Sequence, residues 1–286
     1  MAIVLDNITY TYGMGTPFEK TALHGVSLTI NNGEFLGIIG HTGSGKSTFV
    51  QHLNGLLHPT TGTVTVNGVD ISASTEEAKR MRHKVGMVFQ YPEHQLFEET
   101  IAQDIAFGPK NLGFSEQEVD ERVRDAMKFV GLDYDMYAER SPFHLSGGQM
   151  RRVAIAGVVA MDPDFLVLDE PSAGLDPFGR EEIFEEIIRL HKEKGITVIL
   201  VSHNMEDISR MASRLVVLDK GRIILDGAPM DIFNDHRDEL QAIGVDVPPV
   251  SVTMEYLRSR GLDVSNRVLS VDDAVAAIME GGSHVK

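Results

Sequence analysis

The chain has 286 residues, of which 42% are hydrophobic, so it can bury a sizeable core and is not expected to be disordered. It contains no cysteine, which excludes disulfides, thiol catalysis and cysteine-based metal sites and is consistent with a reducing cytoplasm. Lys and Arg number 26 against 42 Asp and Glu, a formal charge of −16, and this balance argues against nonspecific binding to nucleic acid, which needs clustered cations.

The first third of the chain is predicted to be rich in strands. Apolar and polar residues alternate over 2–12, 25–30 and 62–68, whereas 33–40 is a short apolar run. The N-terminus therefore reads as a strand and not as a basic, apolar signal peptide. After Gly45 the spacing becomes helical, and a strand returns at 83–90. The apolar face of this helix is predicted to contain Phe49, Val50, Leu53, Leu56 and Leu57.

The middle of the chain, roughly 91–160, is predicted to be a helical insertion. Ser115 and Glu118 form a capping box, apolar residues then follow at helical spacing, and Gly131 is a stop signal. A second helix is predicted over 149–161. Its apolar run is far shorter than the ~20 residues that span a bilayer, so any membrane role is expected to come through a partner.

Strands return in the last third, within 164–170, 195–203 and 214–227, with a helix over 180–194 between the first two. Strand, helix, strand at this spacing predicts a parallel α/β sheet.

A boundary rich in Pro and Val at 245–251 divides the main body, 1–245, from an extension over 246–286. The extension has two predicted helices, 252–260 and 271–280, and Ser270 opens the second with a capping box. A piece of this size is too small to hold a core alone. We interpret it as a dimerisation or regulatory extension, with a solvated tail as the alternative.

A glycine-rich segment between a strand and a helix has the spacing GxxxxGKS of a phosphate-binding loop. Its glycines allow backbone N–H groups to point at phosphate oxygens, and the helix adds its positive end. Lys46 is expected to neutralise the β- and γ-phosphates and Ser47 to ligate Mg²⁺. The alternatives are a plain glycine-rich turn between strand and helix and a Rossmann-type loop, but the glycine spacing differs from the Rossmann fingerprint and Lys-Ser follows directly. The loop residues are Gly40, His41, Thr42, Gly43, Ser44, Gly45, Lys46, Ser47 and Thr48.

Two acidic residues end the apolar strand that begins at Phe165. Asp169 is expected to hold Mg²⁺, directly or through water, and Glu170 to polarise the attacking water. The alternative is that both acids simply leave the sheet into solvent. Together with the glycine-rich loop, the pair predicts hydrolysis of a nucleoside triphosphate.

The segment LSGGQ, Leu145 to Gln149, predicts a second anion site at the start of a helix. Alone, Ser-Gly-Gly before a helix is more often a turn and cap. The chain has one phosphate-binding loop, so a second cap for a γ-phosphate makes sense if it serves a neighbouring subunit.

With these motifs in this order, residues 1–245 resemble the ATP-binding subunits of ABC transporters. The resemblance implies a P-loop NTPase (RecA-like) α/β core with an antiparallel β subdomain and an inserted α-helical subdomain, plus here a small α-rich C-terminal extension. Tyr12 matches the aromatic residue that stacks on adenine, and Gln90 the residue that contacts Mg²⁺ and the water. Ser172 stands where many relatives have Thr. The remaining matches are the signature Ser146, Gly147, Gly148 and Gln149, the D-loop residue Asp176 and the switch histidine His203.

A narrower resemblance, to the second of the two paired ATPases of energy-coupling factor (ECF) transporters, rests on the phrases around 90–113 and 145–163 and on the extension. It implies two ATP sandwiched between paired ATPase subunits, as a heterodimer or a homodimer. It also implies an integral-membrane T component, a substrate-binding S component for vitamins or metal ions, a peripheral location on the cytoplasmic membrane face, and no nucleic acid partner.

Other interpretations stay open at this point. A conventional ABC importer subunit shares the core motifs, and a soluble ABC ATPase acting on nucleic acid or the ribosome is the rival class. The residues do not decide which cargo is transported, whether the dimer is a homodimer or a heterodimer, or whether the nucleotide is ATP or GTP. Leu96 and Phe97 lie in the sequence among three acids, Glu93, Glu98 and Glu99. This segment either forms an acidic, partly apolar groove for a basic helix of the membrane subunit, or its two apolar residues belong to the core of the helical subdomain.

Overall fold

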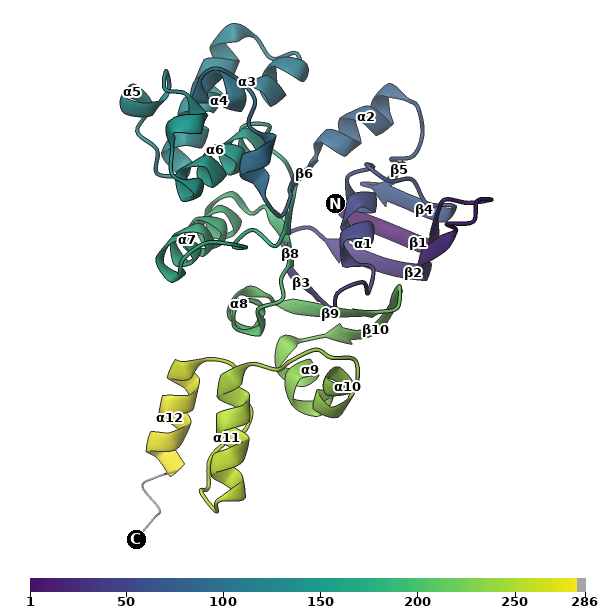
Figure 1. Cartoon of the computed structure of the whole chain (residues 1–286), viewed down its shortest axis with the longest axis vertical. Coiled ribbons are helices and arrows are strands. Elements are labelled where there is room, and N and C mark those ends of the chain that lie inside the picture. Colours follow the sequence, from purple (N-terminus) through teal and green to yellow (C-terminus); the bar gives the residue numbers. More distant parts are fainter. Residues whose placement is uncertain (282–286) are drawn as a thin grey trace.

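The computed structural model describes residues 1–281 and contains a large and a small sheet with helices packed around them (Figure 1). The large sheet has six strands in the order β10-β9-β3-β8-β7-β6. All neighbours in it are parallel except β10, which is antiparallel to β9. The predicted parallel α/β sheet is therefore confirmed. Its strands are β3 (Phe35–Ile39), β6 (Val85–Val88), β7 (Phe165–Asp169), β8 (Thr197–Val201), β9 (Arg214–Asp219) and β10 (Arg222–Gly227).

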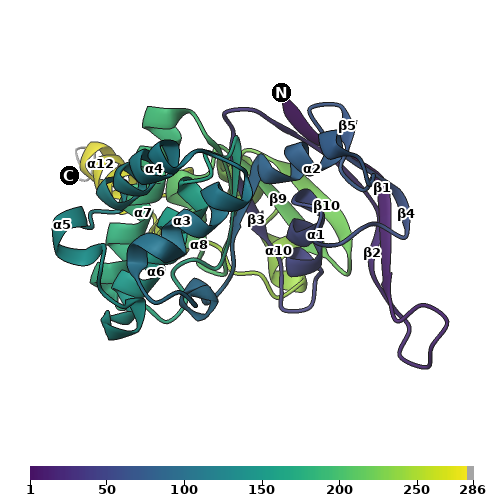
Figure 2. The same cartoon turned by 90° about the horizontal axis from the view of Figure 1, so that it is seen from above.

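The small sheet is antiparallel and has the order β2-β1-β4-β5. Helix α1 (Lys46–Leu53) lies between the two sheets, and the loop that joins β1 to β2 projects from the edge of the molecule (Figure 2). The strands of this sheet are β1 (Ala2–Tyr12), β2 (Lys20–Asn31), β4 (Thr61–Val66) and β5 (Val69–Asp70).

The large sheet is buried on both faces because alternate residues of each strand enter different hydrophobic clusters. In β7, Phe165 and Val167 pack with the small sheet and α1, whereas Leu166 and Leu168 pack with helices on the opposite face. Strands covered on both sides read as continuous apolar runs. This explains why the strand at 165–169 shows no alternation in the sequence.

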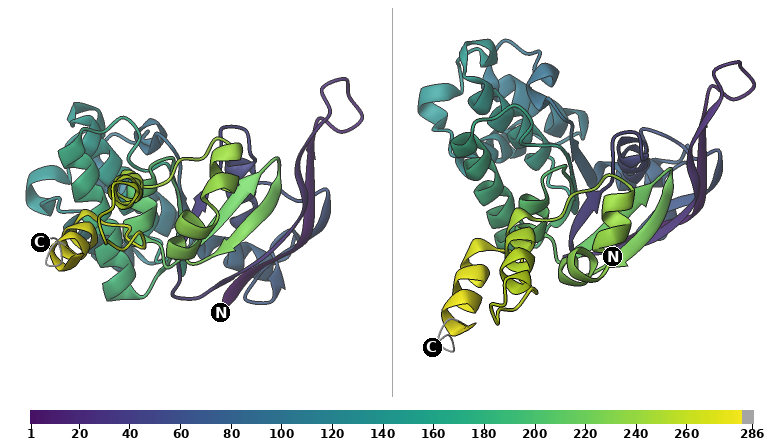
Figure 3. Two further views of the ribbon diagram at one scale, coloured as in Figure 1. Left: turned by 90° about the horizontal axis from the view of Figure 1, so that it is seen from below. Right: turned by 60° about the horizontal axis from the view of Figure 1, so that its bottom comes forward.

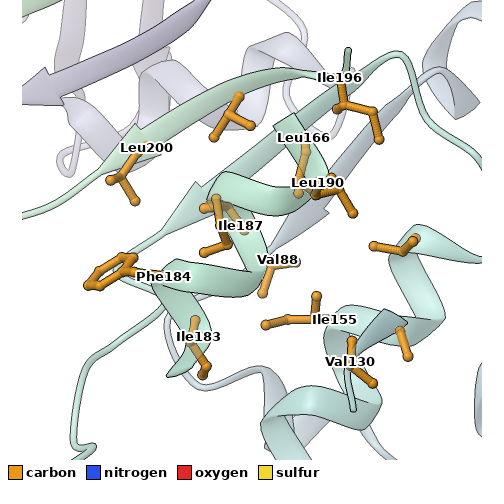
Figure 4. Packing of buried hydrophobic residues seen from close by; sticks show 14 of the residues in the cluster. Val88, Val130, Ile155, Leu166, Ile183, Phe184, Ile187, Leu190, Ile196 and Leu200 are labelled. Atoms are coloured by element: carbon orange, nitrogen blue, oxygen red, sulfur yellow. The ribbon is translucent and has the colours of Figure 1, made fainter. Parts of the chain in front are cut away.

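Helices cover the second face of the large sheet. Those of the predicted insertion are α3 (Ile101–Asn111), α4 (Glu116–Phe129), α5 (Tyr134–Tyr137) and α6 (Gly147–Val159), with 3₁₀ turns at η1 (Pro92–Gln95) and η2 (Pro142–His144). The long helix α7 (Pro177–Lys194) packs between them and the sheet. Figure 4 shows the contact, with Ile155 and Val130 on one side, Ile183, Phe184, Ile187 and Leu190 of α7 between, and Val88, Leu166, Ile196 and Leu200 beyond.

The remaining helices are short or lie near the C-terminus. They are α2 (Glu76–His83), α8 (Met205–Met211), α9 (Pro229–Asp235), α10 (Arg237–Ala242), α11 (Pro249–Ser259) and α12 (Val271–Gly281). Helices α11 and α12 share a small cluster of their own and lie on the opposite side of the molecule from the β1–β2 loop (Figure 3). No helix in residues 1–281 is long and apolar enough to cross a membrane.

Of three local predictions, one is confirmed, one is confirmed in part and one is wrong. Ser115 and Glu118 form the capping box of α4. At Ser270 one half of the predicted box is formed within residues 1–281, where the Asp273 amide donates to Ser270 Oγ over 3.1 Å. The helix after Gly45 stops at Leu53, because Gly55 takes φ +73°, and Leu56 is 56% exposed instead of buried.

Glu186 on α7 is a partly desolvated acid at the junction with α6. Its Oε2 is buried and has no hydrogen-bond partner in the part of the chain that the structure describes, and its Oε1 lies 3.9 Å from Arg152 Nη1. Burial raises the pKa of this carboxyl from 4.5 to about 7, against the opposing charges of Arg152 and Arg189. The folded state thus keeps a proton that the unfolded chain releases, so this group makes stability fall as pH rises through that interval.

We expect Glu186→Gln to raise the free energy of unfolding by about 1 kcal/mol at about pH 8, and by much less at about pH 5, because Gln removes a charge that burial penalises only once the carboxyl ionises. Urea titrations at the two pH values measure this. The matched control is Glu185→Gln, an exposed neighbour that should change stability by less than about 0.5 kcal/mol at either pH. An equal gain from Glu186→Gln at both pH values would contradict the prediction.

Candidate functional site

The glycine-rich loop runs from the end of β3 into α1. Gly40 makes a close approach: a Cβ there would lie 2.3 Å from the Leu218 carbonyl oxygen and 2.6 Å from Ser44 Oγ. The start of α1 has no side-chain cap, so its first backbone N–H groups are not satisfied by a side chain. A loop of this kind leaves amide donors and a positive helix end for an anion.

Lys46 is the first residue of α1 and is 6% exposed. Its ammonium donates to the Gly40 carbonyl over 2.6 Å and to the His41 carbonyl over 3.0 Å. Burial lowers the pKa of Lys46, and the carboxylates of Glu170 and Asp169 oppose that shift. The loop thus holds a buried cation whose partners are neutral carbonyls that an anionic ligand can replace.

Asp169 ends β7 and Glu170 follows it with φ +52°, an uncommon conformation for a residue with a side chain. Burial raises the pKa of Asp169, while a hydrogen bond from Ser47 and the charge of Lys46 oppose this. Burial also raises the pKa of Glu170, to about 7. Both acids are therefore held in the structure and do not simply extend into solvent.

His203 follows β8 and lies beside Glu170. Its Nε2 is 3.4 Å from Glu170 Oε1, a buried oxygen that has no hydrogen-bond partner among residues 1–281. Burial and the charge of Lys46 lower the pKa of His203, which favours the neutral ring. An unpartnered carboxylate oxygen beside a neutral imidazole can accept a proton from a bound water.

Tyr12 is placed at the mouth of the site by the β1–β2 pairing. Its hydroxyl lies 3.0 Å from Thr48 Oγ1, its ring meets Tyr10 edge to face at 4.8 Å, and the residue is 41% exposed. Tyr12 therefore packs against the sheet and still offers surface to a ligand.

One pocket of about 610 Å³ gathers most of the predicted site residues. Lys20, His24 and Lys220 also line it and were not predicted from the sequence; pairing of Lys20 with Tyr12 across the hairpin is the signal that could have found the first. The predicted residues in its lining are Tyr12, Thr42, Gly43, Gly45, Lys46, Ser47, Thr48, Gln90, Asp169, Glu170 and His203.

The signature residues and Asp176 do not line this pocket. Ser146 caps α6 and forms a capping box with Gln149, while Asp176 caps α7 by accepting from the Gly179 amide over 2.7 Å. Gly147 and Gly148 open α6, and a Cβ on either would meet nothing within 4 Å. In the single chain, these residues lie at the starts of helices and are exposed or half-buried.

Arg151, two residues beyond the signature, is a buried cation that the sequence did not reveal. It is 2% exposed and donates to both carboxylate oxygens of Glu93 at 3.1 Å. The same guanidinium donates to the carbonyls of Pro171 and Ala173, each over 2.9 Å. It thereby ties the start of α6 to η1 and to the segment after Glu170.

The sheet, the glycine-rich loop and the acids at the end of β7 together define a P-loop nucleoside triphosphatase. A family model described as ABC transporter matches residues 23–173.

Similar proteins are more specific. The chain is 52% identical over 280 residues to the energy-coupling factor transporter ATP-binding protein EcfA2 of Clostridium tetani, covering 98% of this chain and 97% of that protein. It is 53% identical over 279 residues to the protein of that name from Clostridium acetobutylicum, with the same two coverages.

Solved structures of ABC transporter ATP-binding proteins are similar to the chain as well. The structure of cbiO1 from Clostridium perfringens, part of the ABC transporter complex cbiONQ, has a TM-score of 0.73 and 36% identity, covering 88% of this chain and 98% of that one. The ATP-binding cassette MJ0796, in a dimeric post-hydrolysis state bound to ADP and Pi, has a TM-score of 0.70 and 31% identity, covering 79% of this chain and 98% of that one.

The chain therefore belongs to the ABC transporter family, as one of its energy-coupling factor transporter ATP-binding proteins. It binds ATP, and hydrolysis of ATP is coupled to transport. The resemblance stated from the sequence is confirmed.

We expect Arg151→Met to lower the free energy of unfolding by about 3 kcal/mol, because it leaves Glu93 and the Pro171 and Ala173 carbonyls without their donor. Urea denaturation measures the loss. Arg124→Met is the matched control on α4, since its ion pair with Asp120 is open to solvent and should contribute much less than the buried contacts of Arg151. Equal small losses in both variants would show that the buried contacts contribute little.

Proposed function

We propose that the pocket binds MgATP and that Glu170 is the general base for its hydrolysis. The observation that carries this is the position of Glu170 Oε1, buried without a hydrogen-bond partner 3.4 Å from His203 Nε2 in a pocket shared with the phosphate-binding loop. A water between that oxygen and a γ-phosphate would find a proton acceptor already in place.

The donor set suits Mg²⁺. The Ser47 hydroxyl, hydrogen-bonded to Asp169, and the Gln90 amide provide hard oxygen ligands of the kind that this ion prefers. When bound there, the ion would offset the charge that develops on the phosphates. Lys46 would exchange its two carbonyl partners for β- and γ-phosphate oxygens, and Tyr12 would stack on the adenine.

In the reaction, the water oxygen bonds to the γ-phosphorus while the bond to the β–γ bridging oxygen breaks. The water proton passes to Glu170, and ADP and inorganic phosphate leave. Lys46 and His203 contact the γ-phosphate as charge develops on it.

We propose that each site is completed by a second subunit. Ser146, Gly147, Gly148 and Gln149 start a 13-residue helix, and Asp176 caps another, but neither group lines the chain's own pocket. Two subunits arranged head to tail would close two ATP between the loop of one and the signature helix of the other. A related ATPase is the proposed partner, as a heterodimer, and a homodimer is the alternative.

The membrane partners proposed are a T component and an S component for vitamins or metal ions, with this chain peripheral on the cytoplasmic face. A groove of about 290 Å³ on the helical layer supports a docking site. Phe97 and Phe107 line it, 57% and 44% exposed, with their rings edge to face at 4.8 Å. Leu96 is instead 8% exposed in the core, and Glu93 is paired with Arg151, so the acids left for a basic helix are Glu98 and Glu99.

The proposed dimerisation role of residues 246–286 is supported by apolar side chains on α11 and α12. Tyr256, Val271 and Val275 are 55%, 66% and 54% exposed. The helices hold a small cluster of their own around Met254 and Val268, and the Ser209 hydroxyl donates to the Leu269 carbonyl over 3.2 Å, which attaches them to α8.

We expect Glu170→Gln to bind ATP but to lose nearly all hydrolysis, about 10²-fold or more, because the amide cannot accept the water proton. A tagged variant purified from membranes with ATP should carry a related ATPase and an integral-membrane protein. Recovery of only a self-dimer with ribosomes or nucleic acid would instead support a soluble ABC ATPase.

We expect Glu98→Lys to reduce recovery of the membrane protein by about tenfold, because it reverses the charge beside the groove. Nucleotide affinity of the same sample should stay within about twofold, since Glu98 does not line the nucleotide pocket. Glu116→Lys, an exposed acid on α4, is the charge-matched control. Unchanged recovery with Glu98→Lys would remove the groove from the proposal.

A further inference from the structure

His41, the second residue of the phosphate-binding loop, is held between two oxygens. Its Nε2 lies 2.9 Å from Asp219 Oδ1 at the end of β9, and its Nδ1 lies 2.8 Å from the carbonyl oxygen of Thr42. A carboxylate and a main-chain carbonyl only accept hydrogen bonds. Both ring nitrogens therefore face acceptors.

A neutral imidazole cannot satisfy this arrangement. It carries one N–H, so its other nitrogen would turn a lone pair toward an oxygen. The imidazolium form donates from both nitrogens and completes both contacts, with Asp219 as its counter-ion. The side chains of His41 and Asp219 are 32% and 17% exposed, so the pair is partly shielded from solvent.

The Thr42 contact has a consequence for the loop. In a trans peptide the C=O and N–H point in opposite directions. A carbonyl held on the His41 ring therefore turns the Gly43 N–H away from that ring. Gly43 lines the nucleotide pocket, so the direction of this amide matters to a ligand bound there.

We propose that His41 is a protonation-dependent positioning residue of the nucleotide site. Its imidazolium form orients the Gly43 amide for a phosphate oxygen and adds a positive charge beside the phosphates, so nucleotide affinity falls as His41 loses its proton. This inference rests on the proposed role of the loop in binding nucleotide.

The charges around His41 are compatible with such a switch. Asp219 on β9 contacts the ring directly, and the ammonium of Lys46 contacts the His41 carbonyl over 3.0 Å. An anionic phosphate would add to the field that favours the imidazolium. The other charged or titratable side chains that line the nucleotide pocket are Tyr12, Lys20, His24, Asp169, Glu170, His203 and Lys220.

The test compares nucleotide affinity across pH in matched proteins. The probe is Mg²⁺ with a non-hydrolysable ATP analogue, titrated calorimetrically into the full chain at about pH 6 and about pH 8.5, a range that spans ordinary histidine titration. The proteins are the wild type, His41→Gln, Asp219→Asn and, as a control, His58→Gln at an exposed position. The probe and the other titratable groups of the pocket are the same in all four proteins, so their titration affects all four equally.

From about pH 6 to about pH 8.5 the dissociation constant should rise in the wild type by about fivefold more than it does in His41→Gln. A factor of this size is what the loss of one partly exposed charge can produce. His58→Gln should behave as the wild type, and Asp219→Asn, which removes the charged acceptor of His41 Nε2, should weaken binding at the lower pH. The ¹⁵N shifts of the His41 ring should report an imidazolium at the lower pH.

Two results would count against the proposal in distinguishable ways. Binding with the same pH dependence in wild type and His41→Gln would overturn the role of His41 and leave nucleotide binding intact. No binding by the wild type at either pH would overturn the proposed role of the loop and this inference with it.

Discussion

The parallel register of β6, β7, β8 and β3 places the polar residues of the nucleotide pocket at one edge of the sheet. Asp169 pairs with Val201 across β7 and β8, and Ile38 pairs with Val201 across β3 and β8. The strands therefore end level with one another, and the loops that leave their carboxyl ends meet at that edge. A slip by one residue would exchange the side chains that enter the two buried clusters and disrupt the packing of both, so burial on both faces stabilises the site geometry.

The pocket is built at a local cost that a ligand can relieve. Lys46 is buried with carbonyl partners, Glu170 has an uncommon backbone conformation, and its Oε1 has no hydrogen-bond partner. Such features are stable only where the surrounding fold over-determines them. Phosphates would supply the anion that Lys46 lacks, so nucleotide and protein stabilise each other.

Contacts from distant segments hold the pocket and the helical layer together. Arg151 links α6 to Glu93 and to the carbonyls just after Glu170. A movement of α6 would therefore shift the segment next to the proposed base. On the other side, Asp219 joins β9 to the loop through His41. Both links are charge-assisted, and such hydrogen bonds are among the stronger ones in proteins.

The sequence by itself determined the phosphate-binding loop, the acids after Phe165, the capping box at Ser115 and the alternation of strands and helices that predicts a parallel sheet. These depend on spacing within a few residues or on a short strand-helix-strand unit, which local sterics and hydrogen bonding decide. Only the tertiary structure decided that the helix after Gly45 ends at Leu53, that Glu93 pairs with Arg151 across 58 residues, and that His41 meets Asp219 across 178. Long-range partners of this kind have no periodic signal in the chain, because they depend on how separately formed elements pack.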